Sequence, residues 1–288
     1  MPRRPTRGSG ARLPLMAAAF GVALMSVPAA ALAQQEFAEG TTMAKIQQRG
    51  SLRVGSRFDQ PNVAQMDPVT GTVAGFDADV ARYVGARLGL DPEKVEFSEV
   101  ISANRETSIS QGVVDIVVSG YVITDKRRAV VGQAGPYAIA HQRLFVHEDN
   151  LAKFKTTDDI AGHTVCAPAT STAVPIIKKH GGTFVPIDDN SVCNQQVANK
   201  LVDAKMGNDL LTIGFVKQFS GLAIAAIPDM SDEGWGIGLP KDDAPFCEFL
   251  RTSLNELISS GQWAALWKKH LAPLGLPAQT PPAIEDHC

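Results

Sequence analysis

Apolar runs with strand character alternate with helical patterns along this 288-residue chain, and this alternation limits its fold more than any other feature. Such a chain builds repeated βα units around mostly parallel sheets. We therefore expect an α/β fold. The expected strands are residues 51–56, 94–97, 114–119, 143–146, 163–167, 183–187 and 223–227, and the expected helices are 76–88, 103–111, 124–131, 171–180, 192–202, 210–219, 245–259 and 262–270.

The N-terminus has the pattern of an export signal. Four arginines and no acidic residue precede an apolar run at 13–27, and Ala31 and Ala33 are the small residues that a signal peptidase recognises. The apolar run is shorter than the roughly 20 residues that a membrane-spanning helix needs. We predict that residues 1–33 are a cleaved signal peptide and that the mature protein is periplasmic and begins near Gln34.

The predicted mature chain is acidic. Four of the 27 basic residues and none of the 30 acidic residues lie in the leader, which leaves a net charge of about −7. This balance argues against nucleic acid or an anionic membrane as a partner. About 255 residues remain, more than one hydrophobic core usually supports, so two lobes are expected.

Four cysteines are expected to form two disulfides in an oxidising compartment. Three pairings exist. We favour Cys166–Cys193, which would join neighbouring elements of one lobe, and Cys247–Cys288, which would hold the proline-rich tail on the last helices. Metal binding is the competing interpretation, but the terminal His287-Cys288 is the one close pairing of these residue types. We expect no metal and no cofactor.

Several short motifs follow one another in a fixed order. They are VGSRFDQP at 54–61, GFDADVA at 75–81, the segment 114–127 that ends in ITDKR, AGPY at 134–137, DIAGHTVC at 159–166 and GWGIGLPK at 234–241. In this order they resemble the amino-acid-binding solute receptors of ABC importers, and most closely the glutamate-type branch. Motifs that span nearly the whole mature chain are much more specific than any one of them.

The resemblance implies the type II periplasmic-binding-protein fold, in which two α/β lobes joined by two crossing strands close on a solute. Lobe 1 would comprise residues 34–139 and 235–288, and lobe 2 residues 144–230. The hinge would fall near residues 140–143 and 231–234. The implied partners are a small carboxylate or amino-acid ligand and the permease and ATPase subunits of an inner-membrane ABC transporter, and we expect a monomer.

The resemblance also implies ligand residues in lobe 1. Arg127 would grip the α-carboxylate of the solute, because a guanidinium pairs bidentately with a planar carboxylate. It follows strand 114–119 at the carboxyl end of the sheet, where such folds bind ligands. Gly120 would let the backbone approach the solute. Arg57 would hold a distal carboxylate, and Phe58 would cover the aliphatic part of the solute.

In lobe 2 the predicted ligand residues are Thr170, Ser171 and Thr172. They begin the helix expected at 171–180, whose free N–H groups suit an anion. Helix capping alone would also account for their hydroxyl groups, and the two roles are compatible.

Two positions depart from the family pattern. The family usually has a hydroxyl residue where this chain has Val122, and an acidic partner for the solute's α-ammonium where it has Asn208. Asp209, or one of Asp188 and Asp189, would have to supply that charge, since an unpaired buried charge costs on the order of 3–5 kcal/mol. Otherwise the solute has no ammonium group and is a non-amino organic acid.

Two other functions are compatible with the resemblance. A periplasmic dehydratase resembling cyclohexadienyl dehydratase would need a general acid in the cleft. Glu99, Asp59 and Asp209 are the nearest candidates in the sequence, but surface or helix-cap roles suit each of them better, so we expect no enzyme. The sensing lobe of a receptor ranks last, because the sequence shows neither a downstream membrane helix nor a signalling domain.

Overall fold

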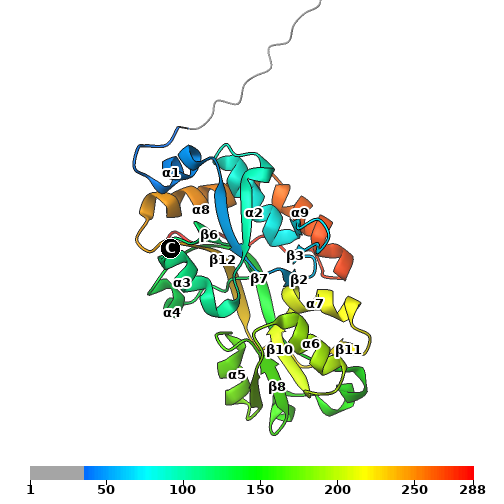
Figure 1. Cartoon of the computed structure of the whole chain (residues 1–288). Helices are drawn as coiled ribbons and strands as arrows, with labels where there is room; N and C mark the ends of the chain where they lie inside the picture. Colours follow the sequence, from blue (N-terminus) through cyan, green and yellow to red (C-terminus); the bar gives the residue numbers. More distant parts are fainter. Residues whose placement is uncertain (1–35) are drawn as a thin grey trace, which may run out of the picture. The chain divides into compact units, whose positions relative to one another are not determined.

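The structure is a computed structural model that describes residues 36–288. The predicted signal peptide at 1–33 lies outside these residues. Within the described part, Figure 1 shows two α/β lobes joined by the strands β7 and β12. None of its helices has the length and apolarity that crossing a membrane requires.

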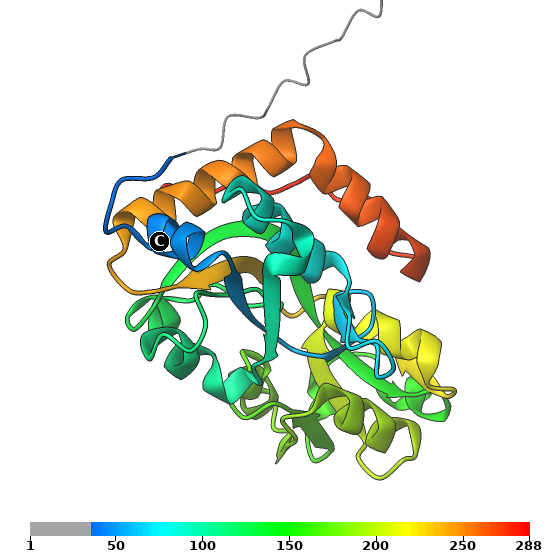
Figure 2. The ribbon, with the colours of Figure 1, turned by 45° about the horizontal axis from the view of Figure 1, so that its top comes forward.

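The first lobe is built from both ends of the described chain. Before the crossing it contains α1 (Thr42–Arg49), β1 (Leu52–Ser56), β2 (Asp59–Gln60), β3 (Ala64–Met66), β4 (Val73–Ala74), α2 (Phe76–Arg87), β5 (Val95–Glu99), α3 (Arg105–Ser110), β6 (Ile116–Val117) and α4 (Asp125–Arg128). After the return crossing it contains α8 (Ala244–Ser259) and α9 (Gln262–His270). Figure 2 shows these last two helices in orange along the outer edge of this lobe.

The second lobe lies between the crossing strands, which are β7 (Gly132–His147) and β12 (Asp232–Leu239). It contains β8 (Thr164–Ala167), α5 (Ala173–Lys179), β9 (Thr183–Pro186), α6 (Asn190–Ala198), β10 (Ala204–Asn208), α7 (Asp209–Gln218) and β11 (Leu222–Ile224).

The strands form a nine-stranded sheet that is continuous because β7 runs through both lobes. Its order is β5-β1-β6-β12-β7-β10-β8-β9, and β11 also pairs with β7. The outer strands pair in parallel, β1 with β5 and β6, and β8 with β9 and β10. This is the arrangement expected of βα units, and the predicted α/β class is confirmed. The small sheet β2-β3-β4 was not predicted.

Strand β7 changes its partner between the lobes. Up to His141 it pairs with β12, and from Gln142 it pairs with β10. The sequence predicted only a short strand at 143–146, because residues 132–142 mix Gly, Gln and Pro with apolar residues. Their extended conformation depends on β12, which follows much later in the chain.

Each lobe has its own hydrophobic core. In lobe 1, the ring of Phe76 from α2 lies 6.2, 6.1 and 6.0 Å from the rings of Tyr137, Trp263 and Trp267. The spacing of apolar residues in α2 turns its buried face toward this cluster. In lobe 2, the core includes Leu144, Phe154, Val165, Ile177 and Met206. The lobes also meet through apolar side chains, since Leu210 of α7 belongs to the buried cluster of lobe 1 and Leu211 and Ile213 pack against it.

Both predicted disulfides are present. Cys166–Cys193 joins β8 to α6 within the core of lobe 2. Cys247–Cys288 joins α8 to the C-terminal tail. The tail is also held where Gln279 Nε2 donates a hydrogen bond to the Ile139 carbonyl at 2.7 Å. Each bridge therefore stays within one lobe and leaves the gap between them unconstrained.

Candidate functional site

A cavity lies between the lobes, at the carboxyl ends of β6, β8 and β10. Its free volume is about 40 Å³, so its walls lie close together. Lobe 1 contributes Ser102, Arg105, Gly120, Val122 and Arg127, strand β7 contributes Gln142, and lobe 2 contributes Pro168, Ser171, Thr172, Asn190, Lys205, Met206, Gly207, Asn208, Leu211 and Thr212.

The loop after β6 is positioned by a buried carboxylate. Asp77, in the first turn of α2, accepts hydrogen bonds from the Gly120 N–H at 2.6 Å and the Tyr137 hydroxyl at 2.9 Å. Gly120 has a φ of 53°, and a Cβ atom there would lie 2.9 Å from Leu211 Cδ2 of lobe 2, so this position requires glycine. Burial raises the pKa of Asp77 to about 7.

Arg127 lies in the lobe 1 wall and is 8% exposed. Thr124 caps its short helix α4 by accepting a hydrogen bond from the Arg127 N–H at 3.2 Å. Arg127 Nη1 donates to the Val122 carbonyl at 2.6 Å, Nη2 donates to the Thr170 carbonyl of lobe 2 at 3.2 Å, and the guanidinium lies over the Tyr121 ring. A guanidinium has five N–H donors, so these contacts fix the group and leave donors for a solute.

Arg105 is a second buried guanidinium that the sequence did not identify. It is 5% exposed, and its Nη2 donates to the Ser119 carbonyl at 2.8 Å. Arg105 and Arg127 both lie over the Tyr121 ring, 5.3 and 4.9 Å from its centroid. Burial, and then the charges of Arg127 and Arg57, lower the pKa of Arg105 to about 9. The sequence feature that indicates a site role for Arg105 is its position soon after β5, at the carboxyl end of the sheet.

Lys205 lies in the lobe 2 wall, on a strand that was not predicted. The sequence pattern does not indicate strand β10, because this lysine interrupts a short apolar run. Lys205 is 1% exposed, and its Nζ donates to Thr212 Oγ1 at 3.1 Å and lies 5.6 Å from the Phe215 ring centroid. Burial lowers the pKa of Lys205 to about 7. Lys205 brings the basic side chains in the wall to three.

The described residues that line the cavity include no carboxylate. Asn208 does line it, but its Oδ1 accepts from Trp235 Nε1 at 3.2 Å and its Nδ2 donates to the Glu233 carboxylate behind the wall. Asp209 turns toward the crossing strand, where its Oδ1 accepts from the His141 N–H at 2.9 Å. The excess of positive charge in this wall favours an anionic ligand.

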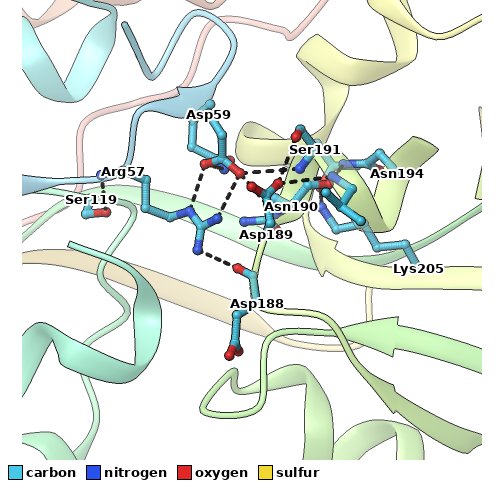
Figure 3. A network of polar contacts seen from close by, with 12 residues as sticks. Arg57, Asp59, Ser119, Asp188, Asp189, Asn190, Ser191, Asn194 and Lys205 are labelled. Carbon is cyan, nitrogen blue, oxygen red and sulfur yellow. Dashed lines mark hydrogen bonds and ion pairs between the residues drawn. The ribbon is translucent and has the colours of Figure 1, made fainter. Parts of the chain in front are cut away.

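A polar network joins the lobes beside the cavity (Figure 3). Asp59 of lobe 1 pairs with Arg57 at 2.8 Å and accepts hydrogen bonds from the Asn190 and Ser191 N–H groups, at 3.0 and 3.3 Å, at the start of α6. Arg57 Nη1 donates to the Asp188 carbonyl of lobe 2 at 2.8 Å. Burial opposes ionisation of Asp59, but Arg57 and the backbone donors outweigh it and hold the pKa of Asp59 well below its ordinary range.

The sequence matches the family model of the bacterial extracellular solute-binding proteins, family 3, over residues 52–273. The match covers most of the chain. This protein belongs to that family. One relative is the glutamate-binding protein GluB of Corynebacterium glutamicum, which is 30% identical over 236 residues that cover 78% of this chain and 79% of GluB.

Solved structures share the two-lobed fold. A mutant of the arginine-binding protein ArgBP from T. maritima gives a TM-score of 0.73 at 28% identity, covering 80% of this chain and 99% of that chain. The ancestral amino acid-binding protein AncCDT-1, a precursor of cyclohexadienyl dehydratase, gives 0.73 at 26% identity with the same coverage. The family 3 relatives are solute-binding proteins rather than enzymes, and members of the family are extracellular or periplasmic.

The structure brings together many of the predicted ligand residues of this family 3 protein. Those that line the cavity are Gly120, Val122, Arg127, Ser171, Thr172 and Asn208. The predicted residues outside the lining are Arg57, Phe58, Thr170 and Asp209. Arg57 directs its donors to Asp59 and lobe 2, and Phe58 packs against a small cluster of Ala64, Val73 and Ala78. Thr170 offers its carbonyl to Arg127.

The other carboxylates considered from the sequence also have partners or lie apart from the lining. Asp188 Oδ1 accepts from the Ala169 N–H at 3.0 Å, and Asp189 caps α6 by accepting from the Val192 N–H at 3.0 Å. Glu99 is exposed at the end of β5. Asp59, held ionised by Arg57, is unsuited to donate a proton. The dehydratase alternative is therefore not favoured.

Proposed function

We propose that this family 3 protein is the solute-binding component of an ABC transporter, which captures a glutamate-class amino acid between its lobes and delivers it to a membrane permease. The observation that carries the proposal is the buried Arg127 guanidinium, fixed in the cavity wall with donors to spare for a carboxylate. The relative GluB, named as a glutamate-binding protein, supports the choice of solute.

The proposal includes where the protein works and how it moves. Residues 1–33 direct export to the periplasm, where the monomer meets the permease and ATPase subunits. Lobe 1 (34–139 with 235–288) and lobe 2 (144–230) close about residues 140–143 and 231–234. The partner change of β7 at His141 and Gln142 supports this position for the hinge.

A ligand screen tests the proposal. Purified protein is heated alone and with acidic, neutral and basic amino acids, and small molecules that co-purify are identified by mass spectrometry. L-glutamate at a hundredfold excess over its dissociation constant should stabilise the fold by about 2.7 kcal/mol, while L-lysine should not. A flat melting response to every acid in the panel contradicts the proposal.

A non-amino dicarboxylate is the second candidate solute. It is favoured by one observation: the described lining contains three basic side chains and no carboxylate to receive an ammonium group. Glutarate, which is L-glutamate without its ammonium group, distinguishes the two candidates. Tighter binding of glutarate than of L-glutamate would select the second.

A further inference from the structure

Lys205 is unusual because its positive charge has few partners within the protein. Its Nζ carries three N–H donors when protonated. Among residues 36–288, one hydrogen-bond acceptor contacts it, the hydroxyl of Thr212, and no carboxylate pairs with it. The contact with the Phe215 ring at 5.6 Å is a weak additional stabilisation. A cation that is 1% exposed and has no counter-charge is costly to bury.

Asp59, the acidic group that acts most strongly on the Lys205 amine, does not meet this need. Asp59 already receives Nε and Nη2 of Arg57, Nε2 of Gln60, and the N–H groups of Asn190 and Ser191. These five donors already exceed the roughly four lone-pair sites of one carboxylate. Asp59 therefore already has its counter-ion in Arg57. Pairing with Asp59 does not account for the burial of Lys205.

The position of Lys205 indicates a different partner. It lines the cavity from lobe 2, whereas Arg127 lines it from lobe 1, and the two cations are held by separate neighbours. A solute with a single carboxylate on Arg127 would leave the lobe 2 cation unpaired when the cavity closes. We infer that Lys205 is a ligand-binding residue that pairs with a second anionic group of the solute, so that the site selects dicarboxylates over their monoamides. This inference rests on the proposed function.

The protonation of Lys205 gives the pairing a measurable signature. Burial lowers the pKa of this amine to about 7, with Asp59 and Asp189 opposing the shift and Arg57 adding to it. An anion beside the amine favours its charged form. Binding of a dicarboxylate should therefore take up a proton near and above neutral pH.

The test uses two matched pairs of probes and titration calorimetry. The pairs are L-glutamate with L-glutamine, and glutarate with its monoamide glutaramate; in each pair one carboxylate is replaced by an amide of similar size. The wild type should bind the diacid of its preferred pair about 10- to 100-fold more tightly than the amide, as expected for a charge-assisted hydrogen bond. Lys205→Met should remove most of that preference, weakening the diacid much more than the amide.

Two further variants keep the result interpretable. Lys205→Gln removes the charge but keeps a polar group, so it should lose the preference even if the methionine variant packs poorly. Lys179→Met changes an exposed lysine of the same lobe and should behave as wild type. Melting curves verify that each variant is folded.

Three results would overturn the inference. If Lys205→Met and Lys205→Gln keep the wild-type preference for the diacid over the amide, the lysine does not pair with the second anionic group. If both variants weaken the diacid and the amide equally, its role is packing. If none of the four probes binds the wild type, the proposed function for this solute class fails together with the inference.

Discussion

Arg57 and Arg127 are both buried arginines at the gap between the lobes, yet their surroundings differ. Arg57 is 3% exposed, and Asp59 faces its Nε and Nη2 at 2.8 Å in a bidentate pair. Arg127 contacts two backbone carbonyls, and the Glu106 carboxylate lies 3.4 Å from its Nε. The role of a buried guanidinium thus depends on how many of its donors the protein already satisfies.

The two regions accordingly do different work in the proposed cycle. The Arg57–Asp59 pair contacts the start of α6 and links the two lobes. The wall around Arg127 has donors left for a solute. Variants of the two regions should therefore change solute affinity by very different amounts.

The largest effect should follow from Arg127→Met. Truncating a buried charged partner costs about 2–5 kcal/mol, so affinity for the bound acid should fall by roughly 30-fold or more. Titration calorimetry measures it. Lys126→Gln, at the exposed neighbouring position of α4, should retain wild-type affinity. Retention of affinity in Arg127→Met would remove the basis of the proposed site.

Asp59→Asn should have the next largest effect on affinity, a loss of roughly tenfold, because it weakens closure without touching the solute. It leaves Arg57 without its counter-charge, so urea unfolding should show a loss of about 3 kcal/mol in the free energy of unfolding. Asp67→Asn, in an exposed loop, is the matched control. An affinity loss as large as that of Arg127→Met would mean that the Arg57 region binds the solute itself.

The stability difference between wild type and Asp59→Asn should also depend on pH. The folded state lowers the pKa of Asp59, so this carboxylate stabilises the fold above the ordinary carboxyl value of about 4. That contribution is lost progressively as pH falls below it. Urea unfolding at pH 6 and pH 3 measures the change, and a difference that does not shrink toward pH 3 would contradict the ion pair.

A change in pH should have a smaller effect on affinity, of a few fold, through Lys205. Its pKa is lowered to about 7 in the fold, so raising the pH from 7.5 to 9.5 removes the fraction that is still protonated and weakens binding of a diacid. The ligand-free protein should become more stable over the same range, by at most about 1.4 kcal/mol per pH unit, because the unfolded chain still holds that proton.

Asp77, whose folded pKa is also about 7, is already mostly ionised in both states above pH 7.5 and adds little to this slope in stability. Calorimetry and urea unfolding at several pH values provide the measurement. Lys205→Met should flatten both curves. Curves of unchanged slope in this variant would show that another group is responsible.

The smallest effect on affinity should follow from removing the Cys247–Cys288 disulfide by substituting both cysteines with Ser. The bridge spans 41 residues, and neither of its cysteines lines the cavity. Its loss should reduce the free energy of unfolding by about 3–4 kcal/mol and change affinity less than about twofold. A large loss of affinity would mean that the tail influences the cavity.

Much of this protein could be predicted from short stretches of sequence. The helices α2, α8 and α9 lie close to their expected ranges, because amphipathic spacing and glycine stops act within a few residues. The even cysteine count predicted two disulfides, and of the three possible pairings the favoured one is present. Arg127 could be singled out because its motif lies in one continuous segment after a predicted strand.

Other features depended on partners distant in sequence. Strand β7 is extended over 16 residues because β12 and β10 supply its hydrogen bonds. From the sequence, Lys205 would be interpreted as a surface lysine. It is buried because β10 lies between β7 and β8 in the sheet. The sequence alone does not distinguish the surroundings of Arg57 from those of Arg127. In the fold, the carbonyl of Asp188 in lobe 2, 131 residues from Arg57 in sequence, accepts a hydrogen bond from the Arg57 guanidinium.

The sequence by itself therefore determined the α/β class, the family, the disulfides and the basic residue after β6, since each depends on local spacing or on motif order. The tertiary structure alone decided which buried charges have many partners in the protein and which have few. The reason is physical: the cost of burying a charge depends on every donor and acceptor around it, and those come from segments that only folding brings together.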